Sequence, residues 1–130
     1  MNQMWEFFER LDEMVYVTNI ETHELVYMNQ HLRQALGYAS REDYLGKMCH
    51  QVLQGLDTPC VFCTDDRLKE GEFVSWTHKN PVLHKRFLVK DTMVSIDGKK
   101  YRIEIAIDAD SEKACKTPYY YARSETILND

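Results

Sequence analysis

The residues that most restrict the fold lie between positions 86 and 108. From position 101 to 108, Tyr or Ile at each odd position alternates with a mostly polar residue at each even position. Because successive side chains of a strand point to opposite faces, this pattern predicts a strand with one apolar face. A second apolar run precedes it, and Asp97 and Gly98 stand between the two, where a type I′ turn requires positive φ. The stretch therefore predicts a long β-hairpin.

Two registers of this hairpin remain open. With a two-residue loop, Val94 lies opposite Tyr101. The same loop places Lys90 and Thr92 on the face of the isoleucines. A three-residue loop places another set on that face: Phe87, Val89, Asp91 and Met93.

Length and charge limit the classes of partner. The chain has 130 residues, which is enough for one domain with its own core. Its 21 acidic and 16 basic residues give a net charge of -5, and the basic residues form no stripe that follows a phosphate backbone. We therefore expect no nucleic-acid partner.

The apolar runs span a few residues each, whereas crossing a bilayer takes about 20. The N-terminal apolar residues are interrupted by Glu6, Glu9 and Arg10, unlike those of a signal peptide. The pattern predicts a cytoplasmic location without membrane insertion, although a segment of a larger membrane protein would look the same.

The N-terminus predicts a short helix that Asn2 can cap. Four apolar residues recur there at helical spacing: Met4, Trp5, Phe8 and Leu11. So short a helix does not bury side chains of this size by itself. Either the helix packs on its own domain, or these residues form the interface with a second copy of the chain.

The sequence pattern of the middle of the chain predicts two strands, then several short helices, and then a further strand. Residues 14–18 and 24–28 are rich in β-formers and form a second hairpin. Three short helices follow, at residues 30–36, 40–46 and 49–53. A further helix begins at Thr64 and ends at Gly71, before a strand at residues 73–78.

The order of these segments resembles the PAS domain family. The matching features are the strand pair that ends at Asn29, the helix end at residues 36–38, the segment 44–47, the turn at Gly98 and the last strand, which ends at Asp108. Asp110 replaces the Thr of the family's closing motif. The resemblance covers residues 11–110 and implies an α+β fold: a five-stranded antiparallel sheet with short helices across one face and an N-terminal helix.

The resemblance also implies a division of the chain and a role. Residues 1–12 form the flanking helix, residues 13–110 the PAS domain, and residues 111–130 a linker or tail. PAS domains of this kind sit in bacterial signalling proteins, before a GGDEF diguanylate cyclase or a histidine kinase. The resemblance thus implies a homodimeric sensory module that binds a small ligand or a partner and regulates an output domain outside these residues.

A ligand pocket is expected where residues 49–70 cross the inner face of the sheet. Its candidate lining residues are Tyr16, Met28, Leu53, Phe62, Leu68, Trp76, Tyr101, Ile103 and Ile105. The flavin-binding members carry a reactive Cys followed by Arg and Phe. Here Cys49 is followed by His50 and Gln51, which disfavours flavin. Haem has little support, with His50 as the candidate ligand.

The alternative function is a metal-binding or redox module built on four cysteine or histidine side chains. Cys60 and Cys63 have the spacing by which one turn supplies two zinc ligands, and Cys49 and His50 are the candidate second half. Adjacent residues point to different sides of a helix, however, and there is no second such cysteine pair. In a cytoplasmic setting the thiols are expected to be reduced, and we predict that they bind no metal.

The sequence predicts no enzymatic activity. The acids Asp65 and Asp66 suit a helix start, and Asp108 and Asp110 suit a strand exit. The histidines His23, His31, His78 and His84 have no Ser, Cys or Asp nearby in a recognisable nucleophile arrangement.

Overall fold

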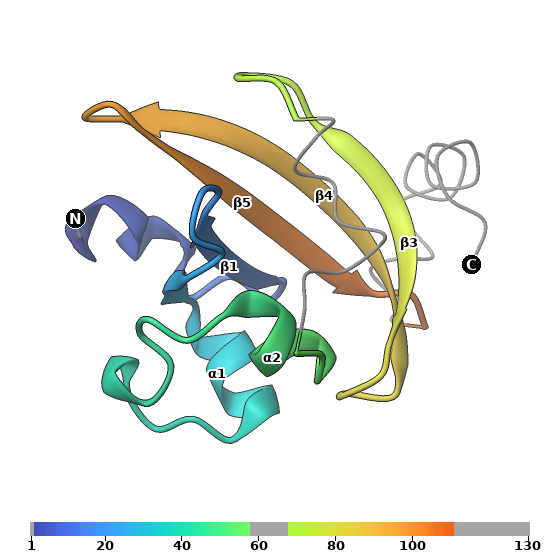
Figure 1. The fold of residues 1–130 in the computed structure, drawn as a ribbon. Coiled ribbons are helices and arrows are strands. Elements are labelled where there is room, and N and C mark those ends of the chain that lie inside the picture. The colour runs from blue at the N-terminus through green and yellow to red at the C-terminus, as the bar shows by residue number, and fades with distance from the viewer. Residues whose placement is uncertain (1, 58–67, 111–130) are drawn as a thin grey trace.

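The computed structural model describes residues 2–57 and 68–110, which form one sheet with helices packed on it (Figure 1). The elements in chain order are η1 (Asn2–Phe8), β1 (Met14–Asn19), β2 (Leu25–Met28), α1 (Gln30–Leu36), η2 (Arg41–Asp43), α2 (Cys49–Gln54), β3 (Val74–Asn80), β4 (Lys85–Ile96) and β5 (Lys99–Asp108). The five strands pair antiparallel in the order β2-β1-β5-β4-β3. Helices α1 and α2 lie against one face, which we call the inner face (Figure 1). The predicted α+β fold is confirmed.

The β4–β5 hairpin has the two-residue loop. Val94 lies opposite Tyr101, and Ile96 lies opposite Lys99. The loop residue Asp97 has φ 52° and Gly98 has φ 79°, as a type I′ turn requires. The structure thus selects the first of the two registers.

The isoleucines of β5 point to the outer face, opposite the helices. Ile103 pairs with Val17, while the next residue, Glu104, pairs with Tyr16 of the inner face. The prediction that Tyr101, Ile103 and Ile105 line the inner pocket is therefore wrong. Alternation identifies the residues that share a face, but it does not tell which face the helices cover.

The N-terminal helix packs on its own sheet. It is a 3-10 helix instead of the predicted α-helix. Trp5 is 4% exposed and meets the Tyr101 ring edge-on, with 6.2 Å between ring centroids. Val15, Val17 and Ile103 belong to the same buried cluster. The outer face near β1 and β5 is therefore also part of the core.

Short polar side chains and a glycine set the ends of helices α1 and η2. The Oδ1 atom of Asn29 accepts the backbone N–H of Leu32 at the start of α1, and Gly37 ends that helix with φ 81°. The Asp43 carboxylate accepts the backbone N–H of Ser40, which completes a capping box at η2. The predicted helix from Thr64 lies largely outside the described residues.

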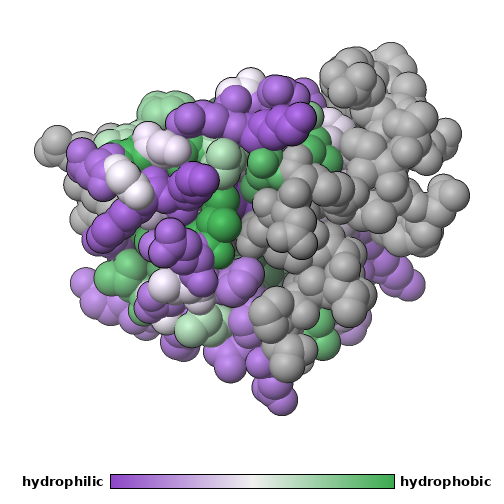
Figure 2. Space-filling model, turned by 45° about the horizontal axis from the view of Figure 1, so that its top comes forward, coloured by the Kyte–Doolittle hydropathy of each residue, from purple (hydrophilic) through white to green (hydrophobic). Residues whose placement is uncertain are grey.

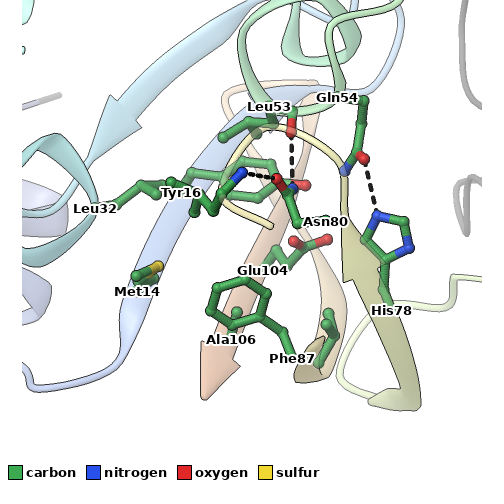
Figure 3. Close-up of a pocket in the computed structure, with 12 residues that line it drawn as sticks. Met14, Tyr16, Leu32, Leu53, Gln54, His78, Asn80, Phe87, Glu104 and Ala106 are labelled. Carbon is green, nitrogen blue, oxygen red and sulfur yellow. Dashed lines mark hydrogen bonds between the residues drawn. The ribbon is translucent and has the colours of Figure 1, made fainter. Parts of the chain in front are cut away.

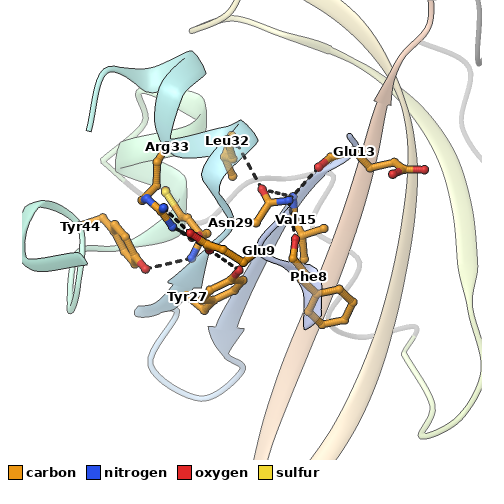
Figure 4. Close-up of polar contacts among 10 residues, drawn as sticks. Phe8, Glu9, Glu13, Val15, Tyr27, Asn29, Leu32, Arg33 and Tyr44 are labelled. Carbon is orange, nitrogen blue, oxygen red and sulfur yellow. Dashed lines mark hydrogen bonds and ion pairs between the residues drawn. The ribbon is translucent and has the colours of Figure 1, made fainter. Parts of the chain in front are cut away.

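Asn29 also ties the N-terminal segment to the sheet (Figure 4). Its side chain is fully buried, and its Oδ1 accepts the Val15 N–H at 3.0 Å. Its Nδ2 donates to the carbonyl oxygens of Phe8 and Glu13, at 3.0 and 2.8 Å. One side chain therefore joins the end of η1, β1 and the start of α1.

An ion pair adds a second attachment of the same segment. The Arg33 guanidinium of α1 bonds both carboxylate oxygens of Glu9, and Tyr27 of β2 donates its hydroxyl to Glu9 at 2.7 Å (Figure 4). The hydrogen bond from Arg33 holds the pKa of Glu9 below its usual value.

Within residues 2–57 and 68–110, no helix has the length and apolar character needed to cross a bilayer.

Candidate functional site

A cavity of about 30 Å³ lies between the helices and the inner face of the sheet (Figure 3). It has room for roughly two water molecules. The residues that line it come from both α-helices, from four strands and from the β3–β4 loop: Met14, Tyr16, Leu32, Leu53, Gln54, His78, Asn80, Leu83, Phe87, Val89, Glu104 and Ala106. Most of the wall is apolar, and the polar groups lie on two sides of it.

The first polar side joins α2 to β3. Asn80 donates from Nδ2 to the Leu53 carbonyl at 2.7 Å, and its Oδ1 accepts the N–H of Leu83 at 2.8 Å. Beside it, a ring nitrogen of His78 lies 2.8 Å from Oε1 of Gln54 (Figure 3). These bonds hold the end of α2 against β3 and close that side of the cavity.

The second polar side of the cavity includes Glu104, which lies on the inner face beside a second carboxyl group that does not line the cavity. Glu104 of β5 lies directly opposite Asp91 of β4 on one side and Tyr16 of β1 on the other. Nε1 of Trp76 donates to Asp91 Oδ2 at 2.8 Å. Asp91 is fully buried and Glu104 is 9% exposed. Two acidic groups are therefore held in contact and away from water.

Arg102 supplies a positive charge to the same region. Its side chain is buried on the inner face, where Nη2 donates to the Tyr16 hydroxyl at 3.2 Å and lies 3.7 Å from the Cys49 sulfur. We call Tyr16, Asp91, Arg102 and Glu104 the inner polar cluster. The guanidinium balances one negative charge of this cluster.

Burial sets the protonation of the cluster. It raises the pKa of Glu104 well above its usual value, and the Asp91 carboxylate raises that pKa further, while Arg102 opposes both. Burial likewise raises the pKa of the Tyr16 hydroxyl. Burial thus favours the neutral carboxylic acid of Glu104 and the neutral phenol of Tyr16.

The structure brings part of the predicted pocket together. Tyr16 and Leu53 line the cavity, and Met28 packs with them in one buried cluster. Trp76 lies on the same face and packs against Phe87 and Val89 without lining the cavity.

The other predicted pocket residues do not join this group. Tyr101, Ile103 and Ile105 lie on the outer face. Leu68 is buried but does not line the cavity, and Phe62 lies outside the described residues.

Sequence reasoning missed Glu104, Asp91 and Arg102 as site residues. The even positions of β5 were assigned to a polar face because charged side chains are usually exposed. The signal that could have found them is the position of β5 in the middle of the sheet. A central strand in a sheet covered on both faces buries its polar residues along with its apolar ones.

The candidate metal ligands fall into two groups. Cys49 and His50 are both buried on α2, and the His50 ring lies 6.0 Å from that of His23. Cys60 and Cys63 lie outside the described residues. In the part of the chain that the structure describes, no three His, Cys, Asp or Glu side chains are grouped to hold a metal.

The predicted dimer interface is divided by the fold. Trp5 is buried in its own domain and Phe8 is half-buried, whereas Met4 and Leu11 are exposed. Phe7, which was not among the predicted residues, is 73% exposed. On the face that Figure 2 shows, apolar areas are interspersed with polar side chains. The interface therefore stays a prediction, in which Trp5 has no exposed surface to contribute.

The fold is similar to that of solved PAS domains. No protein-family model and no curated protein sequence matches the chain. Its structure is similar to the PAS domain of an HTR-like protein from Haloarcula marismortui, with a TM-score of 0.65 and 16% identity, over 82% of this chain and 89% of that one.

Two further structures show the same likeness. The PAS domain of nitrogen regulation protein NR(II) from Vibrio parahaemolyticus has a TM-score of 0.61 and 8% identity, over 79% of this chain and 94% of that one. The Rhodobacter sphaeroides LOV protein has a TM-score of 0.63 and 20% identity, over 98% of this chain and 82% of that one. At these identities, the likeness establishes the fold.

The described site does not fit a flavin or a haem. Pockets for molecules of that size have volumes of roughly 300–1,000 Å³, and this cavity has about 30 Å³. Neither Cys49 nor His50 is among the residues that line it. No step of the proposed function is therefore assigned to either cofactor.

Proposed function

We propose that the chain is a sensory PAS module that binds a small ligand in the inner cavity and regulates an output domain outside these residues. The observation that carries this proposal is a cavity walled by both α-helices and four of the five strands, so that an occupant contacts most of the fold. The likeness to a PAS domain of a nitrogen regulation protein favours a regulatory role. The proposed output domain is a histidine kinase or a diguanylate cyclase, and the module itself is proposed to be non-enzymatic, cytoplasmic and homodimeric.

The walls define the ligand that suits this cavity. Leu32, Leu53, Phe87 and Val89 offer apolar contacts, and Glu104 offers one acidic hydrogen-bonding group. Because the present volume admits roughly two waters, any larger ligand must displace side chains when it enters. A small, mainly apolar molecule with one polar group meets these conditions.

The experiment is native mass spectrometry of protein purified from a cell extract without added cofactors. The wild type should carry a mass above that of the chain, which denaturation removes. The variant Ala106→Leu should lose this mass, because Ala106 lines the cavity and the added carbons fill it. The control Lys79→Leu changes an exposed residue on β3 and should retain the mass.

A native mass equal to the chain alone in all three proteins would contradict ligand binding. The same spectra test the alternative function. Zinc retained by the wild type, and lost when Cys60 and Cys63 are both replaced by Ala, would favour the metal-binding module.

A further inference from the structure

Asp91 and Glu104 cannot both be ionised at low cost in this structure. They are direct cross-strand partners, a position in which side chains lie about 5 Å apart and like charges destabilise the sheet. Both side chains are buried, so water screens neither carboxyl group. Two carboxyl groups held this close avoid mutual repulsion when one of them carries a proton.

In the part of the chain that the structure describes, the groups around the pair come from β1, β3, β5 and α2. Tyr16 of β1 and Trp76 of β3 contact it as neutral hydrogen-bonding groups. Arg102 of β5 is the charged neighbour, and α2 contributes the Cys49 thiol beside Arg102. His78 of β3 lies on the other polar side of the cavity and bonds Gln54. With one proton on the carboxyl pair, one negative charge faces one guanidinium.

We propose that Glu104, buried opposite Asp91, is protonated in the folded domain at neutral pH, and that this proton is a switch in the floor of the cavity. With the proton bound, the inner polar cluster is neutral and strands β4 and β5 stay joined beneath the cavity. Loss of the proton leaves two adjacent carboxylates against one cation, and their repulsion weakens the β4–β5 contact at the cavity floor. The inference concerns the domain itself and does not depend on which ligand enters.

The sign of the pH effect follows from where the proton is held. Burial keeps the pKa of Glu104 above that of a glutamate in the unfolded chain, so the folded domain retains a proton that the unfolded chain releases. The stability from this proton is complete at pH values below the unfolded pKa of about 4.3. It declines as pH rises from there to the folded pKa, and the unfolding constant increases about tenfold per pH unit.

The test measures urea unfolding between about pH 5 and pH 9. Glu104→Gln keeps a group that donates to Asp91 but removes the titration. In the wild type, the titration of Glu104 should change the unfolding constant about tenfold per pH unit, in addition to the effect of the other titrating groups. In Glu104→Gln this additional change should be absent. Glu21→Gln, at an exposed glutamate, is the control and should follow the wild type. Parallel profiles for the wild type and Glu104→Gln would overturn the proposal.

A second measurement uses the wild type alone, so it does not depend on whether Glu104→Gln folds. The wild type at neutral pH should show the infrared C=O stretching band of a buried, protonated carboxylic acid, and this band should disappear at alkaline pH. Absence of the band at neutral pH would overturn the proposal even if Glu104→Gln failed to fold.

Discussion

At the scale of single residues, the Asn29 side chain joins several separate segments of the chain through hydrogen bonds. Its amide makes four hydrogen bonds, two to backbone N–H groups and two to carbonyl oxygens, so its full bonding capacity is used inside the core. Backbone groups that are buried without a partner cost about 1–3 kcal/mol each. The same position is the N-cap of α1.

Replacing this side chain by Ala therefore removes all four hydrogen bonds. Asn29→Ala should lower the free energy of unfolding by about 3 kcal/mol, through lost capping and unsatisfied backbone groups. Gln30→Ala, at the exposed next position, is the control. Equal urea midpoints for the two variants would show that water replaces the lost bonds.

At the scale of elements, local patterns predicted the hairpins and helix ends because each depends on residues close in sequence. The β4–β5 turn and the end of α1 at Gly37 are of this kind. The face that the helices cover depends on long-range packing, which alternation in one strand does not encode. The carboxyl pair was missed for the same reason, since Asp91 and Glu104 meet only once the register is known.

The turn of the long hairpin offers a test of element geometry. Gly98 has φ 79°, where a β-branched side chain is strained. Gly98→Val should destabilise the domain by more than about 1 kcal/mol. Asp97→Gly relieves the neighbouring positive φ and should not destabilise it. A Gly98→Val protein with the wild-type melting temperature would mean that the turn rearranges freely.

At the scale of the whole molecule, both faces of the sheet contribute to the core. Helices α1 and α2 cover the inner face, and η1 covers part of the outer face through Trp5. This arrangement separates two roles within the N-terminal helix. Trp5 stabilises the domain itself, whereas Phe7 and Met4 are exposed on η1, and Phe7 is the more exposed of the two.

The two roles give opposite expectations for two variants. Phe7→Ser should leave the melting temperature unchanged and lower the sedimenting mass from dimer to monomer, because an exposed aromatic anchor is lost. Trp5→Ala should lower the unfolding free energy by roughly 3 kcal/mol or more. If Phe7→Ser sediments with the mass of the wild type, η1 is not the interface.

The bonds of Asn29 also have a mechanical consequence. Leu32 lines the cavity, and its backbone N–H is held by the same amide that holds the carbonyl of Phe8. A ligand that displaces Leu32 outward must therefore strain the hydrogen bonds of this amide, including its hydrogen bond to the end of η1. Asn29 therefore couples the cavity wall to the N-terminal segment, so that a displacement of Leu32 is transmitted to the end of η1.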